Sequence, residues 1–170
     1  MGYLPDAMIN FLARIGWSHG DQEIFTRDEL IEKFAFDHVG TSGGVFNQEK
    51  LLWLNGHYLK TTDEKTLAVS LIPFLEKEGI KVVLDDFLYR SIGLSKERAR
   101  TLLELVQFVK PYLVEVIEIE ETSREYVRDT RWLSELAPVF SALESFDEQS
   151  VKAAVEKFVQ DKKIKLKEIA

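Results

Sequence analysis

Three short motifs of one kind recur along this sequence, and each is typical of the first turn of an α-helix. They occupy residues 26–29, 61–64 and 145–148, where a Thr or Ser is followed three positions later by a Glu. The hydroxyl can accept a hydrogen bond from a free backbone N–H at the helix start, and the glutamate can reach back to the cap residue. Apolar residues at helical spacing follow each motif. The sequence therefore predicts an all-α fold.

Other residues predict where further helices begin and end. Pro5 suits the first position of a helix that Gly16 ends, and Asn47 is a typical cap residue before the next apolar face. Ser95 is expected to cap a helix that continues to about residue 109. Pro111 should end that helix, because the residue before a proline disfavours the helical conformation.

The second half of the chain has a less regular pattern. Residues 113–119 alternate apolar and acidic side chains, and a helix or an extended link is favoured over a strand because no partner strand is visible. A helix is expected over about 125–140, with Pro138 as an interruption. Residues 164–169 resemble the start of another helix. An apolar pattern that ends without a cap suggests that the given chain is cut from a longer one.

Composition places the chain among globular proteins. It has 170 residues, of which 45% are hydrophobic and 30% charged, and this suits one ordinary domain or two small ones. No apolar run approaches the ~20 residues that a membrane span needs. The N-terminus lacks the layout of a secretory signal, so we expect a cytoplasmic protein. The absence of cysteine excludes disulfides, thiolate zinc sites and cysteine nucleophiles.

The charge is distributed unevenly. The net charge of −7 argues at first sight against a nucleic-acid partner. Residues 151–170, however, hold six lysines against three carboxylates and are net +3, which leaves −10 for residues 1–150. A basic end on an acidic body indicates that the two parts have different partners. The plain alternative is a solvated helix face.

Catalytic signatures are poor. His19, His38 and His57 lie far apart in the sequence, without the close spacing of helical metal sites. Neither a Gly-x-x-x-x-Gly-Lys phosphate loop nor a Gly-x-Gly-x-x-Gly motif is present. We therefore predict no catalytic residue and no metal ligand in this chain.

An aromatic stretch offers two interpretations. Trp53 and Tyr58 flank Asn55 and Gly56. In one interpretation the apolar side chains belong to the core, and Gly56 lets two helices approach closely. In the other, Trp53 stacks on a ligand and Asn55 hydrogen-bonds phosphate or sugar.

Several segments resemble bacterial-type glutamyl-tRNA synthetases. Sequence motifs of that family occur here in the same order and at the same spacing, at residues 2–8, 10–20, 23–25, 45–46 and 50–58. Beyond residue 60 the resemblance is weaker. It consists of the spacing of the helices and of two short basic motifs, at 110–111 and 163–166. The chain looks like the C-terminal part of such an enzyme, truncated at both ends.

The resemblance implies a fold and a set of domains. It implies a multi-helix anticodon-binding bundle, of the α-helical cage type, preceded by a small, mostly helical stem-contact segment. The end of the stem-contact region would occupy residues 1–60, and a helical anticodon-binding subdomain residues 61–143. Residues 144–170 would begin a second, truncated anticodon-binding subdomain.

The function that the resemblance implies is tRNA binding within a class I glutamate–tRNA ligase, which attaches glutamate to tRNA(Glu) using ATP with Mg²⁺. The ATP-site signatures of that family are absent from the sequence, so this segment should hold no cofactor and be inactive alone. The expected partners are tRNA(Glu), with tRNA(Gln) as a further candidate, and neither DNA nor a membrane. The family is usually monomeric.

The resemblance also suggests tRNA-binding residues. Trp53 would lie near the inner side of the tRNA, with the neighbouring side chains close to it. In family members that reject tRNA(Gln), an Arg follows a motif of a basic residue and a proline, and it recognises the anticodon. Tyr112 occupies that position here. A Tyr makes fewer directed contacts with a base than an Arg does, which predicts a non-discriminating or altered reader. The full candidate set is Lys50, Trp53, Asn55, Tyr58, Lys110, Tyr112, Lys163 and Lys165.

Two other classes of function are open at this point. A helical protein-interaction module without tRNA contact would suit the acidic body and the exposed charged faces. An independent hydrolase would need a nucleophile–base pair, and the sequence shows none.

Overall fold

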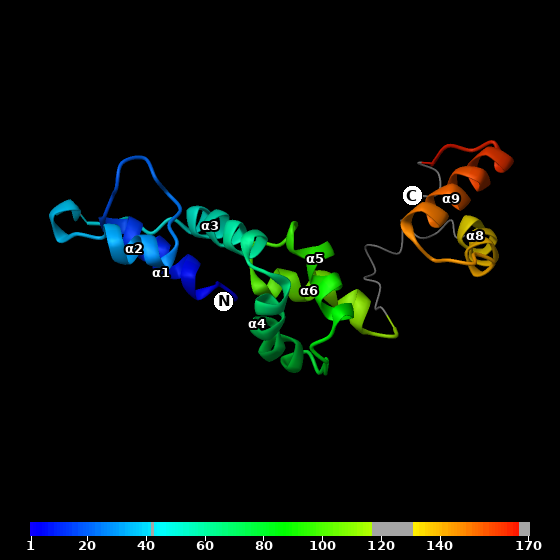
Figure 1. Cartoon of the computed structure of the whole chain (residues 1–170), viewed down its shortest axis with the longest axis horizontal. Helices are drawn as coiled ribbons and strands as arrows, with labels where there is room; N and C mark the ends of the chain where they lie inside the picture. Colours follow the sequence, from blue (N-terminus) through cyan, green and yellow to red (C-terminus); the bar gives the residue numbers. More distant parts are fainter. Residues whose placement is uncertain (42, 117–130, 167–170) are drawn as a thin grey trace. The chain divides into compact units, whose positions relative to one another are not determined.

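The computed structural model describes residues 1–41, 43–116 and 131–166, and the chain divides into two units, Met1–Ile117 and Glu118–Ala170. Within these residues every regular element is a helix, and the β-type pairing is a single antiparallel bridge between Trp17 and Val39. The prediction of an all-α fold is therefore confirmed. Figure 1 shows the helices in chain order.

The first half of unit 1 contains α1 (Pro5–Gly16), α2 (Arg27–Lys33), the 3-10 helix η1 (Phe36–His38) and α3 (Gln48–Thr61). The expected starts are confirmed, since Pro5 occupies the first turn of α1 and the side chain of Asn47 accepts the Lys50 N–H. At Thr26 both bonds of the capping box form. α1 packs against both α2 and α3 (Figure 1).

The second half of unit 1 is a three-helix cluster of α4 (Glu64–Lys77), α5 (Asp86–Lys96) and α6 (Leu102–Leu113), which pack on one another. Its core is aliphatic, and two residues from the N-terminal segment, Leu4 and Ala7, belong to it. The core residues that α4, α5 and α6 contribute are Leu67, Ala68, Leu71, Leu75, Leu88, Ile92, Leu102, Leu105, Val106 and Val109.

Unit 2 is described from α8 (Arg131–Ser141) to the turn after α9 (Glu148–Lys162). The two helices pack against each other. Phe158 of α9 is buried and meets the Trp132 ring edge to face, with ring centroids 6.1 Å apart. The end of α9 is a left-handed turn at Lys163, with φ 54° and ψ 39°.

Two predicted caps, Thr61 and Ser145, were placed wrongly. The cap residue of α4 is Asp63, whose carboxylate accepts the Thr66 N–H, and the cap residue of α9 is Asp147. Thr61 instead bonds back to α3. A carboxylate at a helix start accepts the same hydrogen bond as a hydroxyl and is also stabilised by the helix dipole. The aspartates therefore replace the predicted hydroxyl caps.

The largest error concerns residues 86–111. Ser95 does not cap a helix but lies buried near the end of α5, a helix that the sequence analysis had missed; Thr101 caps α6. Pro111 lies inside α6 rather than after it, and Pro73 and Pro138 also lie within helices. A proline is tolerated there because packing offsets the lost hydrogen bond. The predictions for 117–122, 125–130 and 167–170 lie outside the described residues.

Candidate nucleic-acid interface

The outer face of α3 carries an exposed aromatic ring among basic side chains. Trp53 is 52% exposed, Lys60 is exposed, and Lys50 is half-buried. Arg100, from the loop between α5 and α6, reaches the same helix, because its Nη1 lies 3.6 Å from Oε2 of Glu49. We refer to Lys50, Trp53, Lys60 and Arg100 as the α3 surface. An indole ring among cations is a suitable surface for nucleic acid.

The lysines of the α3 surface also face carboxylates. Lys50 Nζ lies 2.6 Å from Oε2 of Glu23, and Lys60 Nζ lies 3.8 Å from Oε2 of Glu97. Exposed ion pairs contribute little to stability. A phosphate group could therefore replace each carboxylate at small cost.

Glu23 connects the α3 surface to α1. Its Oε1 lies 2.8 Å from Nη2 of Arg14, and its other oxygen faces Lys50. The hydrogen bond from Arg14, followed by the one from Lys50, holds the pKa of Glu23 below its usual range. The carboxylate thus stays ionised and holds Lys50 beside the first turn of α3.

Asn55 points inward, away from the α3 surface. Its side chain is fully buried. Oδ1 accepts the Leu4 N–H at 2.7 Å, and Nδ2 donates to the Arg100 carbonyl at 2.5 Å. These bonds hold Asn55 between two backbone segments, so its amide is placed to support the interface rather than to lie on it.

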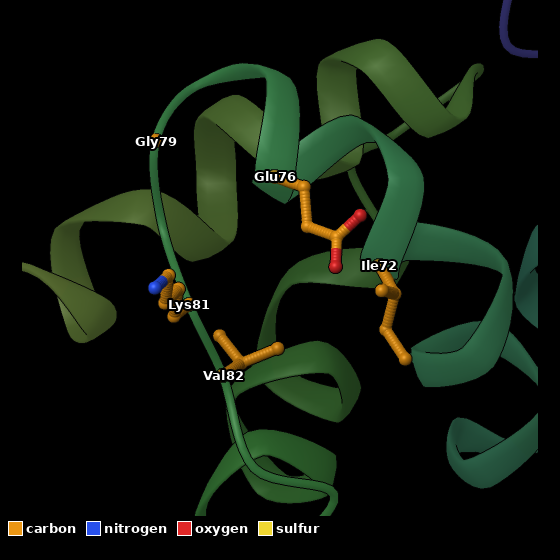
Figure 2. Close-up of a pocket in the computed structure, with 5 residues that line it drawn as sticks. All are labelled: Ile72, Glu76, Gly79, Lys81 and Val82. Carbon is orange, nitrogen blue, oxygen red and sulfur yellow. The ribbon is translucent and has the colours of Figure 1, made fainter.

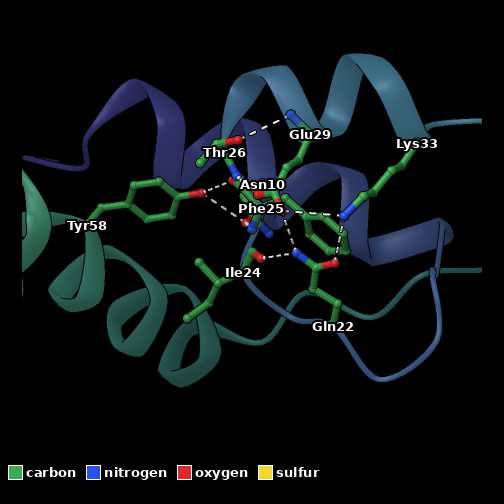
Figure 3. A network of polar contacts seen from close by, with 8 residues as sticks. All are labelled: Asn10, Gln22, Ile24, Phe25, Thr26, Glu29, Lys33 and Tyr58. Carbon is green, nitrogen blue, oxygen red and sulfur yellow. Dashed lines mark hydrogen bonds and ion pairs between the residues drawn. The ribbon is translucent and has the colours of Figure 1, made fainter.

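Tyr58 also points into the protein (Figure 3). Its hydroxyl lies 2.5 Å from the Phe25 carbonyl and 2.9 Å from Oδ1 of Asn10. Burial, with smaller effects from the charges of Asp6 and Glu29, raises the pKa of Tyr58 to about 12. The ring links α3 to the segment before α2.

A second group of candidates lies near the end of α6. Lys110 Nζ pairs with Oε2 of Glu78 at 3.0 Å, and Tyr112 is 43% exposed. An exposed Tyr ring can stack on an unpaired base. Lys110 and Tyr112 are thus available at one end of a helix whose other end lies beside α3.

In unit 2, Lys163 and Lys165 are exposed and follow directly after α9. Lys163 adopts the left-handed backbone conformation that ends α9. The structure therefore divides the eight predicted residues into groups: a pair on α3, two inward-pointing residues, a pair on α6, and a pair in unit 2.

Lys60 and Arg100 were not among the residues predicted from the sequence. Lys60 lies seven positions after Trp53 and so falls on the same helix face, a spacing that the sequence does show. Arg100 comes from a different element, and its nearness to α3 follows only from tertiary packing. A Cβ built on Gly56 would lie 3.6 Å from Cγ of Arg100.

The described residues also have features outside the nucleic-acid interface. In the parts of the chain that the structure describes, no group of three side chains could hold a metal ion. A hollow at the end of α4, shown in Figure 2, is lined by Ile72, Glu76, Gly79, Lys81 and Val82. These residues include no nucleophile with a neighbouring base. None of the helices in the described ranges has the length and apolar character needed to cross a membrane.

Two family models match the chain. Residues 66–170 match the family model described as "Anticodon binding domain", and residues 1–53 match "tRNA synthetases class I (E and Q), catalytic domain". The first of these models covers more than half of the chain, which therefore belongs to the anticodon-binding domain family.

Relatives that the chain resembles over nearly its whole length include glutamate–tRNA ligases. The chain is 43% identical to the glutamate–tRNA ligase of Thermodesulfovibrio yellowstonii over 99% of its own length, and 41% identical to that of Geobacter sulfurreducens over 97%. It spans 38% and 36% of those two proteins. A crystal structure of a glutamate tRNA ligase from Elizabethkingia meningosepticum in complex with its amino acid matches 96% of the chain and 33% of that protein, with a TM-score of 0.80 at 28% identity.

Proposed function

We propose that this chain is the tRNA-binding part of a glutamate–tRNA ligase that acts in the cytoplasm as a monomer. The observation that carries the proposal is the anticodon-binding family match over residues 66–170. The synthetase catalytic-domain match over residues 1–53 supports it. The whole enzyme would attach glutamate to tRNA(Glu) for translation.

ATP and Mg²⁺ chemistry would come from elsewhere in the ligase. The described residues include no cluster of metal ligands, and the ATP-site signatures of the family are absent from the sequence. The chain's own contribution is selection of the tRNA. The proposed organisation is a stem-contact region over 1–60, an anticodon-binding subdomain over 61–143, and the start of a second over 144–170.

Direct contact with tRNA is assigned to the exposed candidates. On the α3 surface, Trp53 would stack or pack on sugar and base, while Lys50, Lys60 and Arg100 exchange their carboxylates for phosphates. Lys163 and Lys165 would contact phosphates of the tRNA backbone. The buried Asn55 and the inward-pointing Tyr58 would act by holding the α3 surface in place.

Lys110 and Tyr112 would read the anticodon. Tyr112 is exposed and can stack on a base, but it lacks the paired N–H donors with which an Arg fixes a base edge. The proposed ligase would therefore accept tRNA(Gln) as well as tRNA(Glu).

Salt-dependent binding tests the proposed function. The isolated chain should bind tRNA with an affinity that falls steeply as salt rises, because phosphate contacts release counterions. Trp53→Ala should weaken binding about tenfold, in line with the loss of one stacked base. The matched control is Phe87→Ala, which removes a ring that is 58% exposed on α5, away from the α3 surface. Equal affinity of Trp53→Ala and the wild type would contradict the assignment.

A charging assay tests the reading of the anticodon. The whole ligase is expected to charge both tRNAs, and Tyr112→Arg should shift it towards tRNA(Glu). Strict rejection of tRNA(Gln), unchanged in Tyr112→Ala, would refute the assignment of Tyr112.

A further inference from the structure

Three backbone-directed hydrogen bonds connect the two family-matched regions of unit 1. The Leu4 N–H donates to Asn55 Oδ1 at 2.7 Å, and Asn55 Nδ2 donates to the Arg100 carbonyl at 2.5 Å. The Leu102 N–H donates to the Gly2 carbonyl at 2.7 Å. Gly2 and Leu4 lie in the range matched by the catalytic-domain family, and Arg100 and Leu102 in the anticodon-binding range. Asn55 lies between the two ranges. We call these five residues the module joint.

Gly2 allows the N-terminal segment to approach the backbone at the start of α6 closely. Its φ is +79°, and a Cβ built there would lie 3.0 Å from the backbone nitrogen of Leu103. A residue with a side chain would be strained in this conformation and would also crowd the start of α6. The Gly2 carbonyl thereby reaches the Leu102 N–H, which belongs to the first turn of α6 and has no partner within the helix.

Apolar packing reinforces the joint. Leu4 is 6% exposed and Ala7 is fully buried, and both belong to the aliphatic core of α4, α5 and α6. The N-terminal segment is therefore a part of that core. The two regions are joined by a packed interface and do not depend only on the covalent link between α3 and α4.

α6 extends from the joint to the candidate anticodon-reading residues. Its first residue is Leu102, and its last turns carry Lys110 and Tyr112. A helix of 12 residues is about 18 Å long. Its N-terminus is fixed by Gly2, while the carbonyl of Arg100 just before it is held by Asn55.

We infer that Asn55 is a positioning residue that locks α6 to α3. The lock sets the distance between the α3 surface and the Lys110–Tyr112 end of α6, so that one tRNA meets both in a preorganised arrangement. Two contact sites held at the right separation bind one ligand more tightly than two sites that move independently. This role rests on the proposed function.

Asn10 provides a matched control for Asn55. It too is a fully buried asparagine: its Oδ1 accepts the Phe25 N–H at 2.7 Å, and its Nδ2 donates to the Glu23 carbonyl at 3.0 Å. Each asparagine therefore joins a backbone donor to a backbone acceptor. Asn10 also accepts the Tyr58 hydroxyl at 2.9 Å and so acts among α1, the segment before α2 and α3. Asn55 instead joins α3 to the second matched region.

Hydrogen exchange on the 170-residue chain tests the lock without tRNA. In Asn55→Ala, the amides of Leu4 and Leu102 should exchange about tenfold faster, because a buried hydrogen-bond partner is lost. In Asn10→Ala, the Phe25 amide should respond while Leu102 does not. Gly2→Ala, which disturbs the joint from its other side, should reproduce the effect on Leu102 and covers the case in which Asn55→Ala fails to fold. Unchanged exchange at Leu102 in a folded Asn55→Ala variant would overturn the inference.

Binding then tests the consequence of the lock. Asn55→Ala should weaken binding of intact tRNA about tenfold and leave the affinity for an isolated anticodon stem–loop within about twofold, because the stem–loop engages one end only. Faster exchange with unchanged binding of intact tRNA would refute the positioning role. If the wild-type chain bound no tRNA, the proposed function would fail, and hydrogen exchange would still decide whether Asn55 locks the joint.

Discussion

The hydroxyl oxygen of Tyr58 lies 2.9 Å from Oδ1 of Asn10, a residue 48 positions earlier in the chain. The same hydroxyl reaches the Phe25 carbonyl. Three segments that are distant in the sequence therefore meet at one phenol oxygen: α1, the residues before α2, and α3 (Figure 3). Trp53 and Lys50 extend from this same helix, so the α3 surface depends on a contact behind it.

Removal of this hydroxyl should destabilise the chain. Tyr58→Phe keeps the ring and loses the bond to the Phe25 carbonyl, so we expect the free energy of unfolding to fall by about 1–2 kcal/mol. Urea unfolding measures the difference. Tyr112→Phe removes a hydroxyl from an exposed ring and should change the free energy by less than about 0.5 kcal/mol. Equal effects of the two variants would show that the Tyr58 bonds contribute nothing.

The same residue predicts an alkaline transition. Burial raises the pKa of Tyr58 from 10.0 to about 12, so the folded state favours the neutral phenol. The stabilisation is fully present below pH 10 and is lost as the pH rises through about 12. Unfolding measured between pH 9 and 12 should show a loss of stability in the wild type that is smaller in Tyr58→Phe. Parallel curves for the two proteins would contradict the raised pKa.

Acid should weaken the start of α2. The backbone hydrogen bond from Thr26, aided by Gln22, lowers the pKa of Glu29 from 4.5 to about 2. A lowered pKa stabilises the folded state above pH 4.5, and this contribution disappears as the pH falls towards 2. Glu29→Gln should therefore flatten the stability profile between pH 4.5 and 2. Glu32→Gln on the same helix, exposed and outside the capping box, is the control for loss of one charge.

Gly56 should tolerate alanine. The Cβ would meet Cγ of Arg100 at 3.6 Å, which is ordinary contact, so close helix approach does not require this glycine. Alanine is favoured over glycine inside a helix by about 1 kcal/mol. Thermal unfolding should show Gly56→Ala to be neutral or stabilised. Gly44→Ala is the contrasting variant, because its Cβ would overlap the Ile15 side chain, and it should be destabilised.

The sequence predicted those parts of the fold that local chemistry determines. Pro5, Thr26 and Asn47 each start a helix as expected, because a fixed φ or a side-chain acceptor acts within one turn. Ser95 was misplaced because its buried position comes from packing against α6, where its hydroxyl reaches the Phe108 carbonyl at 3.4 Å. Pro111 was misjudged for the related reason that tertiary contacts sustain α6 past it.

The candidate site was predictable to a similar degree. Trp53 and Lys50 could be found because they lie on one helix within a recognisable word, and the structure exposes them fully or in part. Asn55 belongs to the same word, but its burial between Leu4 and Arg100 depends on segments 51 and 45 residues away. Sequence spacing along one helix contains no information on such partners, and this is also why Arg100 was missed.

The left-handed turn at Lys163 allows charge and backbone geometry to be separated. A side chain at positive φ costs roughly 1–2 kcal/mol, and glycine is the residue that helix ends of this kind usually carry. Lys163→Gly would therefore remove an ammonium group while making the turn easier to form. Most substitutions of a basic residue leave open whether the lost charge or a damaged helix end weakens binding. At position 163 any loss of affinity for tRNA would report the missing cation alone.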